Sequence, residues 1–182
     1  TTGIFVRRSL TDFALPDACL GPPVRRVRLL GPSLAGVTLE SPHDEFRVGR
    51  MGRLYTHLLA DAGRTGATLR LGTRYVGSEA EGSATRVGLE TGGRRATVRA
   101  RFLLGADGAV SSVAADLGLG ENSVWIVGVE DVYAARTQDV EPRLTCVLDP
   151  RYAPGYVGWV ANDGEEIHVG VSGYADRFEP RR

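Results

Sequence analysis

The sequence contains no lysine, and all 22 of its basic residues are arginine. A lysine Schiff base or a lysine nucleophile is therefore excluded anywhere in the chain. Cysteine is scarce too, because only Cys19 and Cys146 occur and they form no Cys-x-x-Cys pair. The three histidines, at positions 43, 57 and 168, show no ligand spacing. A disulfide framework and a metal site are both disfavoured, and a reducing cytoplasm is the expected location.

Long apolar runs are missing as well. No stretch approaches the roughly 18 apolar residues of a transmembrane helix, and no signal peptide is visible, so we expect no membrane-spanning segment. The formal net charge is zero, from 22 basic and 22 acidic residues, which argues against a surface for nucleic acid. A chain of 182 residues can form one domain or two small lobes.

The hydrophobic periodicity predicts a mixed α/β chain. Alternation before residue 50 predicts a small antiparallel meander over 24–30, 37–39 and 46–48. The period then becomes helical over 51–64, with one apolar stripe and glycines at its end. The remaining predicted strands are 68–71, 75–76, 85–90, 95–100, 124–134, 144–148, 156–161 and 167–171, with a hairpin turn at Gly92-Gly93.

Residues 101–113 are the most informative stretch. The continuous apolar run 102–104 predicts a strand buried on both faces of a parallel sheet. It ends in Gly105-Ala106-Asp107-Gly108, and a short Ala-rich helix begins at Ser111-Ser112. A helix start of this kind offers N–H groups to an anionic ligand, whereas the carboxylate of Asp107 suits sugar hydroxyls. An equally weighted alternative is that Asp107 only caps the helix, with the glycines serving turn geometry.

Arg50 stands just before the predicted helix over 51–64. A cation there interacts unfavourably with the helix dipole, at a cost of a few tenths of a kcal/mol. Together with the N-terminus of the helix, however, it can bind an anion. A solvated arginine with no particular role is the alternative of equal weight.

Gly105-Ala106-Asp107-Gly108, followed by Ser112, resembles the second flavin-binding motif of FAD-dependent oxidoreductases, Gly-Ala-Asp-Gly-x-x-Ser. These families include the aromatic hydroxylases and the geranylgeranyl reductases. The resemblance implies that Asp107 binds the ribityl chain of FAD and that neighbouring amides approach its pyrophosphate. It also implies that Arg50, or Arg53 with a shift along the helix, contacts the FAD phosphates. The implied cofactor-binding residues are Arg50, Gly105, Asp107, Gly108 and Ser112.

A second resemblance lies towards the end of the chain. Residues 154–159 (Pro-Gly-Tyr-Val-Gly-Trp) and 168–171 (His-Val-Gly-Val) resemble a pattern of the geranylgeranyl reductase family. There the strand lines the cavity for a lipid substrate, which implies that Tyr156 and Trp159 are substrate-binding. Val157 takes the place of the family's tyrosine, and Ala161-Asn162 replaces its Phe-Pro. Core packing of the two aromatic residues is the favoured alternative.

Two motifs of these flavoproteins are not found. The first FAD motif, Gly-x-Gly-x-x-Gly after a strand, has no counterpart, and neither has the C-terminal Gly-Asp-Ala motif. The chain also begins with Thr1-Thr2-Gly3 rather than methionine. We therefore expect the central fragment of a longer protein, inactive alone and holding FAD weakly or not at all.

The expected fold is mixed α/β: a partial FAD-binding Rossmann-like layer with a β-meander, plus an antiparallel sheet of a substrate domain. The expected divisions are 1–44 (part of the substrate-domain sheet and a connection), 45–120 (partial FAD-binding domain) and 121–182 (substrate-domain sheet).

Three functions remain open. The first is reduction of a carbon–carbon double bond in a hydrophobic, isoprenoid-like substrate by reduced FAD, with NAD(P)H as a candidate electron donor. The second is an aromatic-type monooxygenase that uses the same cofactor, and the third is a non-catalytic module that retains the fold. No residue is identified as a catalytic acid or base. Peripheral membrane contact is left open for a lipid substrate.

Overall fold

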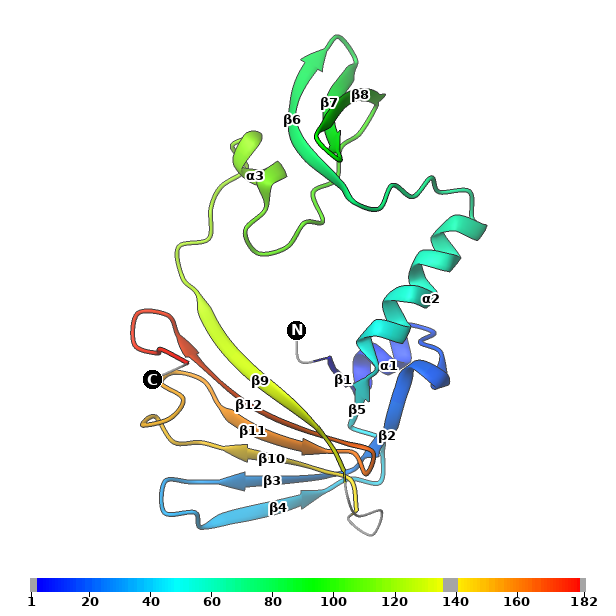
Figure 1. Ribbon diagram of the computed structural model, residues 1–182. Helices are drawn as coiled ribbons and strands as arrows, with labels where there is room; N and C mark the ends of the chain where they lie inside the picture. The colour runs from blue at the N-terminus through cyan, green and yellow to red at the C-terminus, as the bar shows by residue number, and fades with distance from the viewer. Residues whose placement is uncertain (1–2, 136–140, 181–182) are drawn as a thin grey trace. The chain divides into compact units, whose positions relative to one another are not determined.

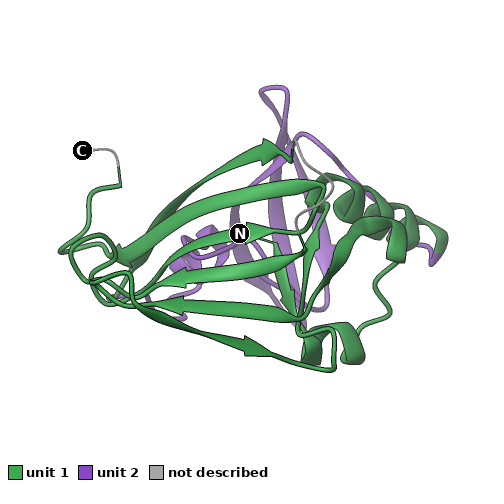
Figure 2. Ribbon diagram, turned by 90° about the horizontal axis from the view of Figure 1, so that it is seen from below, with its two compact units in different colours: residues 1–64, 124–182 green, residues 65–123 purple. Residues whose placement is uncertain are grey.

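The computed structural model describes residues 3–135 and 141–180, with the elements labelled in Figure 1. The chain divides into two compact units, coloured separately in Figure 2: unit 1 comprises residues 1–64 and 124–182, and unit 2 comprises residues 65–123. Residues 45–64, grouped above with the FAD-binding half, belong to unit 1 by their contacts. Thr1 and Thr2 lie outside the described residues.

Unit 1 is built on two sheets. The six-stranded sheet has the order β4-β3-β10-β11-β12-β9, and its neighbouring strands are antiparallel except for β3 and β10. The smaller sheet has the order β1-β5-β2. The elements are β1 (Ile4–Val6), α1 (Arg7–Asp12), the 3-10 helix η1 (Asp17–Cys19), β2 (Leu20–Val24), β3 (Arg26–Leu30), β4 (Gly36–Glu40), β5 (Phe46–Gly49), α2 (Met51–Arg64), β9 (Ile126–Ala134), β10 (Arg143–Val147), β11 (Gly158–Asn162) and β12 (Glu166–Tyr174).

Unit 2 is a three-stranded antiparallel meander with one short helix. The meander consists of β6 (Thr73–Glu81), β7 (Ala84–Thr91) and β8 (Arg94–Ala100), and the helix is α3 (Ser112–Asp116). Gly92 and Gly93 both have positive φ, 55° and 78°, which the tight turn between β7 and β8 requires. The predicted hairpin is confirmed.

The core of unit 1 lies between its two sheets. Val24 and Val48 come from the small sheet, and Leu144, Trp159 and Ala161 come from the six-stranded sheet. All five are at most 8 % exposed. Fully burying a Val or Leu side chain contributes roughly 1.5–3 kcal/mol to the stability of the fold. One face of the six-stranded sheet therefore packs against the small sheet and forms the core.

This inward face changes from apolar to polar across the sheet. In one cross-strand row Cys146, Trp159 and Gly170 lead to Glu130, each the register partner of the one before. Paired residues of neighbouring strands share a face. In the next row Ala161 pairs with His168, so a histidine follows the core directly. The polar end of the face, on β12 and β9, forms the wall of a cavity described below.

Several predicted elements are confirmed. The helix over 51–64 forms with the predicted bounds as α2. The mixed α/β class, the β-meander of the predicted FAD-binding domain (β6-β7-β8) and the sheet of the predicted substrate domain are also present. Of the predicted apolar stripe of α2, however, only Leu54 is buried, whereas Tyr55, Leu58 and Leu59 are 40–54 % exposed. Among the described residues, none of the helices combines the length and the apolar character that a membrane crossing needs.

One predicted pairing and two predicted strands are wrong. The predicted meander before residue 50 forms only in part: β3 and β4 make a hairpin, but β5 pairs with β1 and β2 in the other sheet. The predicted strands 68–71 and 102–104 do not form. Phe102 and Leu104 are 79 % and 83 % exposed, so the expected strand buried on both faces is contradicted. A strand needs neighbours for its backbone groups, and no described strand pairs with either segment.

Gly170 allows the Trp159 ring to lie across β12. A Cβ atom at position 170 would come within 2.1 Å of this ring. We expect Gly170→Ala to lower the free energy of unfolding by about 1–3 kcal/mol, because the ring must leave its place in the core. Gly158→Ala is the matched control, since its Cβ would meet Val147 at an ordinary 3.7 Å. Urea denaturation of both variants tests this, and equal midpoints would contradict the assigned packing.

Candidate functional site

The loop at Asp107 is organised around the start of α3. One carboxylate oxygen of Asp107 accepts a hydrogen bond from the Ser111 hydroxyl at 2.5 Å, and the other accepts from the backbone N–H of Val113 at 3.2 Å. Ser111 is the N-cap of α3, and its hydroxyl oxygen accepts from the N–H of Ala114 at 2.9 Å. Two side chains therefore cap this helix together, as the capping alternative predicts.

Steric constraints explain why both Gly105 and Gly108 of the motif are glycine. A Cβ at Gly105 would lie 2.9 Å from the Cβ of Val113 in α3, so only glycine lets the loop pass this close to the helix. Gly108 has a φ of +92°, in the region that side chains rarely adopt. The loop is therefore held against α3 by geometry that alanine would not tolerate at either position.

Capping leaves Asp107 available to a ligand. The hydrogen bond from Ser111 is the largest cause that lowers the pKa of Asp107, assisted by the backbone N–H of Val113, so the side chain is a carboxylate at neutral pH. Asp107 is exposed, and a carboxylate has about four lone-pair sites, of which the cap uses two. The remaining sites can accept hydrogen bonds from hydroxyls, so capping and binding a polyol are compatible.

The serine that contacts Asp107 is Ser111. Ser112, the predicted cofactor contact, is the exposed first residue of α3 and affects Asp107 through its backbone N–H. Ser111 was not predicted as a site residue, although the spacing Gly-Ala-Asp-Gly-x-x-Ser places the serine of the motif at position 111. A contact of Ser112 with the cofactor stays a prediction.

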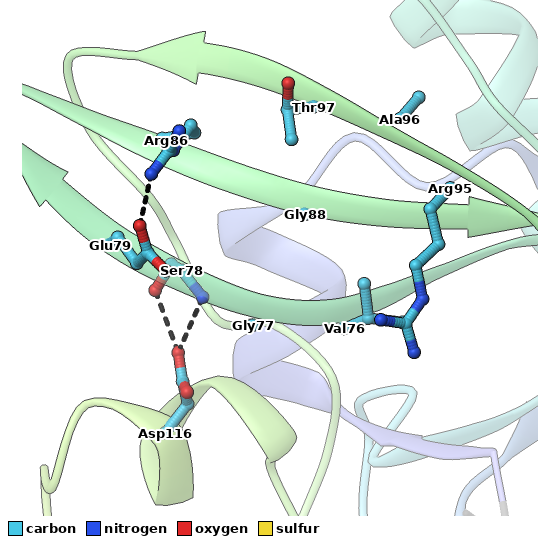
Figure 3. Close-up of a pocket in the computed structure, with 10 residues that line it drawn as sticks. All are labelled: Val76, Gly77, Ser78, Glu79, Arg86, Gly88, Arg95, Ala96, Thr97 and Asp116. Carbon is cyan, nitrogen blue, oxygen red and sulfur yellow. Dashed lines mark hydrogen bonds and ion pairs between the residues drawn. The ribbon is translucent and has the colours of Figure 1, made fainter.

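Asp116, at the end of α3, ties the helix to the meander. Its carboxylate accepts hydrogen bonds from the backbone N–H and the hydroxyl of Ser78, at 3.0 and 2.9 Å (Figure 3), and from the hydroxyl of Tyr75. The residue before Ser78, Gly77, has a φ of +130° and follows a register shift in β6. These bonds border a cavity of about 680 Å³ in unit 2. They fix α3, and with it the Asp107 loop, on β6.

We expect the acid sensitivity of unit 2 to depend on Asp116. Hydrogen bonds from Tyr75, then from Ser78, lower the pKa of Asp116 in the folded state. Its contribution to stability is therefore present above the unfolded pKa of about 4 and is lost as the pH falls through the lower folded pKa. Asp116→Asn should lower the thermal midpoint at neutral pH and flatten its decline in acid. Parallel pH curves for the variant and the natural protein would contradict this role.

Arg50 is buried in an acidic cluster of unit 1. Its side chain is 11 % exposed, and its guanidinium lies 2.8 Å from Asp163, 2.6 Å from Glu165 and 2.7 Å from Glu166. Burial lowers the pKa of Arg50, but hydrogen bonds to Glu165 and Asp163 outweigh it and the net shift is upward. The alternative of a solvated arginine is wrong. Contact with a phosphate stays a prediction, and an anion would compete there with three carboxylates. Arg53, one turn further along, is exposed.

A second cavity, of about 750 Å³, opens beside Arg50 in unit 1. Its ionisable lining residues are Arg50, Arg53, Glu130, Glu165, Glu166 and His168, together with Tyr133. A chain of polar contacts runs along this wall from Trp159 through Glu130, His168 and Glu166 to Arg50. Beyond strand alternation, no pattern in the sequence indicates this chain of contacts, because the register that brings Glu130 beside His168 is not a local property.

The two predicted substrate residues lie in different surroundings. Trp159 is 7 % exposed within the core, which confirms core packing, and its indole N–H donates to Glu130 at 2.7 Å. Tyr156 lies before β11 and is 52 % exposed, so core packing is wrong for Tyr156. Substrate contact by either residue stays a prediction. The predicted cofactor residues are also divided, because Arg50 is in unit 1 and Asp107 is in unit 2.

Comparison with known proteins identifies the class. Residues 31–165 match the family model described as FAD binding domain. The rice (Oryza sativa subsp. japonica) chloroplastic geranylgeranyl diphosphate reductase is 26 % identical over 177 residues, which covers 89 % of this chain and 38 % of the rice protein. The fold, the Asp107 loop and these matches define a protein of the FAD-dependent oxidoreductase class. Within that class, the chain belongs to the FAD binding domain family.

Solved structures agree on the fold. A geranylgeranyl bacteriochlorophyll reductase-like protein from Thermoplasma acidophilum superposes with a TM-score of 0.83 at 21 % identity, covering all of this chain and 48 % of its own. The p-nitrophenol 4-monooxygenase of Pseudomonas putida gives a TM-score of 0.69 at 14 % identity, covering 97 % of this chain and 48 % of its own. The predicted resemblance to geranylgeranyl reductases is confirmed. This chain spans less than half the length of each of these proteins.

Proposed function

We propose that the chain is the central part of a flavoenzyme that reduces a carbon–carbon double bond in a hydrophobic, isoprenoid-like substrate. The likeness to the rice geranylgeranyl diphosphate reductase over 89 % of the chain supports this substrate class. The observation that carries the flavin role is the exposed Asp107 carboxylate, which is held by α3 and retains free acceptor sites.

The residues present fit FAD. The ribityl chain is a polyol, and the free lone pairs of Asp107 can accept hydrogen bonds from its hydroxyls. Nothing lies within 4 Å of the place that a Cβ at Gly108 would take, so the loop leaves room for a cofactor beside Asp107. In unit 1, the exposed Arg53 supplies positive charge at the start of α2, whereas the charge of Arg50 is already met by three carboxylates. When bound, reduced flavin supplies a hydride. The chain's own part is to hold the cofactor and to line the substrate cavity.

The exposed apolar segments fit this proposal. Leu69, Leu71, Phe102 and Leu104 are 44–83 % exposed in unit 2, in the two segments 68–71 and 102–104 that were predicted as strands. In the natural full-length protein, we propose, further strands pair with these segments and bury them. The Asp107 loop would then follow the carboxyl end of a completed strand, where open α/β sheets bind their ligands.

The test uses the natural full-length protein. Purified with FAD and reduced by NADPH without oxygen, it is expected to convert a polyprenyl diphosphate into a product that has gained two hydrogens. Rapid oxygen uptake with a hydroxylated aromatic product would replace this proposal with the monooxygenase. A colourless protein that takes up no added FAD would leave only the non-catalytic module.

A further inference from the structure

The turn between β3 and β4 holds a leucine in an unfavourable backbone conformation. Leu34 has a φ of +62°, and among the described residues it is the only one besides glycine with a positive φ. Two hydrogen bonds of 2.9 Å close the turn: the N–H of Gly31 donates to the carbonyl of Ala35, and the N–H of Leu34 donates to the carbonyl of Gly31. Hairpin loops of this length need a left-handed residue before the second strand, and glycine suits this position best. A leucine here therefore lowers the stability of the fold.

Packing within the chain does not offset this cost. Leu34 is 67 % exposed, so its side chain gains little from burial. Residues held in rare backbone conformations cluster at sites that bind or act on other molecules. An exposed leucine that costs stability therefore points to a contact outside the folded chain.

A second loop of unit 1 lies beside this turn. β3 and β10 are parallel neighbours, so the loops that follow them, 31–35 and 148–157, leave the same edge of the six-stranded sheet (Figure 1). The guanidinium of Arg151 in the second loop donates to the carbonyl of Pro32 in the first, at 3.1 Å. Together the two loops present four large side chains that are 48–67 % exposed and one exposed guanidinium. We call these five residues the loop surface: Leu34, Leu148, Arg151, Tyr152 and Tyr156.

The accessible charge of the loop surface is positive. Asp149 and Arg151 are the only charged residues of the two loops. The side chain of Asp149 is 3 % exposed and lies 2.6 Å from the guanidinium of Arg151, whereas the side chain of Arg151 is 67 % exposed. The guanidinium also lies 5.7 Å from the centre of the Tyr152 ring. An anionic surface approaching these loops would therefore meet a cation and no exposed carboxylate of theirs.

We propose that the loop surface binds the boundary between headgroups and acyl chains of a lipid bilayer, with Leu34 inserted among the acyl chains. Tyrosine rings have an apolar body and a polar tip, which suits this boundary. Arg151 is placed to pair with the phosphates of anionic lipids. An isoprenoid-like substrate, the class given in the proposed function, would dissolve in the same bilayer, but binding of the bilayer does not depend on catalysis.

The test uses Leu34→Asn and Tyr152→Ser in the natural full-length protein, with flotation on vesicles of phosphatidylcholine alone or mixed with phosphatidylglycerol. Asparagine tolerates the left-handed conformation, so Leu34→Asn removes the apolar side chain without adding backbone strain. Leu39→Thr is the matched control, because Leu39 is 54 % exposed in the same hairpin but lies towards the far end of β4. Arg151 is left in place, since its removal would leave the buried Asp149 without its partner.

We expect the natural protein to float with both kinds of vesicle, and about 5-fold more strongly when phosphatidylglycerol is present. Leu34→Asn should lower the partition coefficient about 10-fold, and the double variant with Tyr152→Ser about 100-fold. Leu39→Thr should bind as the natural protein does. The thermal midpoint of Leu34→Asn should be no lower than that of the natural protein.

Three results would overturn the proposal and leave the proposed function intact, because reduction of a dissolved substrate is measured separately. The first is a natural protein that floats with neither kind of vesicle, and the second is equal flotation of the variants and the natural protein. The third is a lower thermal midpoint or a changed oligomeric state in Leu34→Asn, which would show that protein covers this leucine. Flotation that depends on Leu34, in a protein that reduces no double bond, would support the lipid contact and contradict the proposed function.

Discussion

Asp107→Asn is expected to weaken FAD binding by the natural full-length protein by about 10- to 100-fold. The substitution removes the charge from a side chain that, in our account, accepts hydrogen bonds from ribityl hydroxyls. A hydrogen bond to a charged group contributes about 1.5–3 kcal/mol, which corresponds to this range of affinity. The dissociation constant can be measured from the quenching of flavin fluorescence as FAD is titrated into apoprotein.

Two controls separate this effect from others. Glu121→Gln removes an exposed carboxylate from the same unit and should leave FAD affinity unchanged. Because Asp107 also caps α3, the thermal stability of the apoprotein must be compared as well. Ser111→Ala disturbs the cap but leaves the carboxylate, so it should cost less affinity than Asp107→Asn. Equal affinity of Asp107→Asn and natural protein would count against a role of Asp107 in binding FAD.

Gly21→Ala is expected to give the largest loss of stability in unit 1. A Cβ at this position would lie 2.1 Å from Asp163 Oδ2 and 2.9 Å from Arg50 Nη2. Asp163 is fully buried, and its other oxygen accepts the backbone N–H groups of Glu165 and Glu166. The methyl group must therefore separate a buried ion pair. Breaking such a pair costs about 3–5 kcal/mol, and the partners that Arg50 keeps should reduce this to about 2–4 kcal/mol.

Thermal and urea unfolding of the variant measure this loss. Gly52→Ala is the matched control, because nothing lies within 4 Å of its Cβ and the residue is helical. It should change the free energy of unfolding by no more than about 1 kcal/mol, in the stabilising direction. If the two alanine variants unfold at the same temperature and the same urea concentration, Gly21 does not pack against the Arg50–Asp163 pair.

Local signals explain which elements the sequence predicts well. The apolar stripe and the flanking glycines define α2, and Gly92-Gly93 defines the turn between β7 and β8. The Gly-Ala-Asp-Gly loop and the short helix after it are likewise found where expected, since capping residues and glycines act on their immediate neighbours.

Non-local pairing explains the remainder. An apolar run such as 102–104 predicts a buried strand, but the run does not contain the partners that would bury it. The alternation over 46–48 predicts β5 correctly, yet it does not show that β5 pairs with β1 and β2. Glu130 and His168 meet only because β9 and β12 pair in one particular register. Arg50 could be placed before its helix, but not in a cluster with residues 163–166.

A structure of the natural full-length protein with FAD bound would show whether Asp107 contacts the ribityl chain. We expect a carboxylate oxygen of Asp107 to lie within hydrogen-bond distance, about 2.5–3.2 Å, of a ribityl hydroxyl. The same side chain should keep its contacts with Ser111 and Val113 at the start of α3. A ribityl chain bound elsewhere, with Asp107 facing only solvent, would contradict the account.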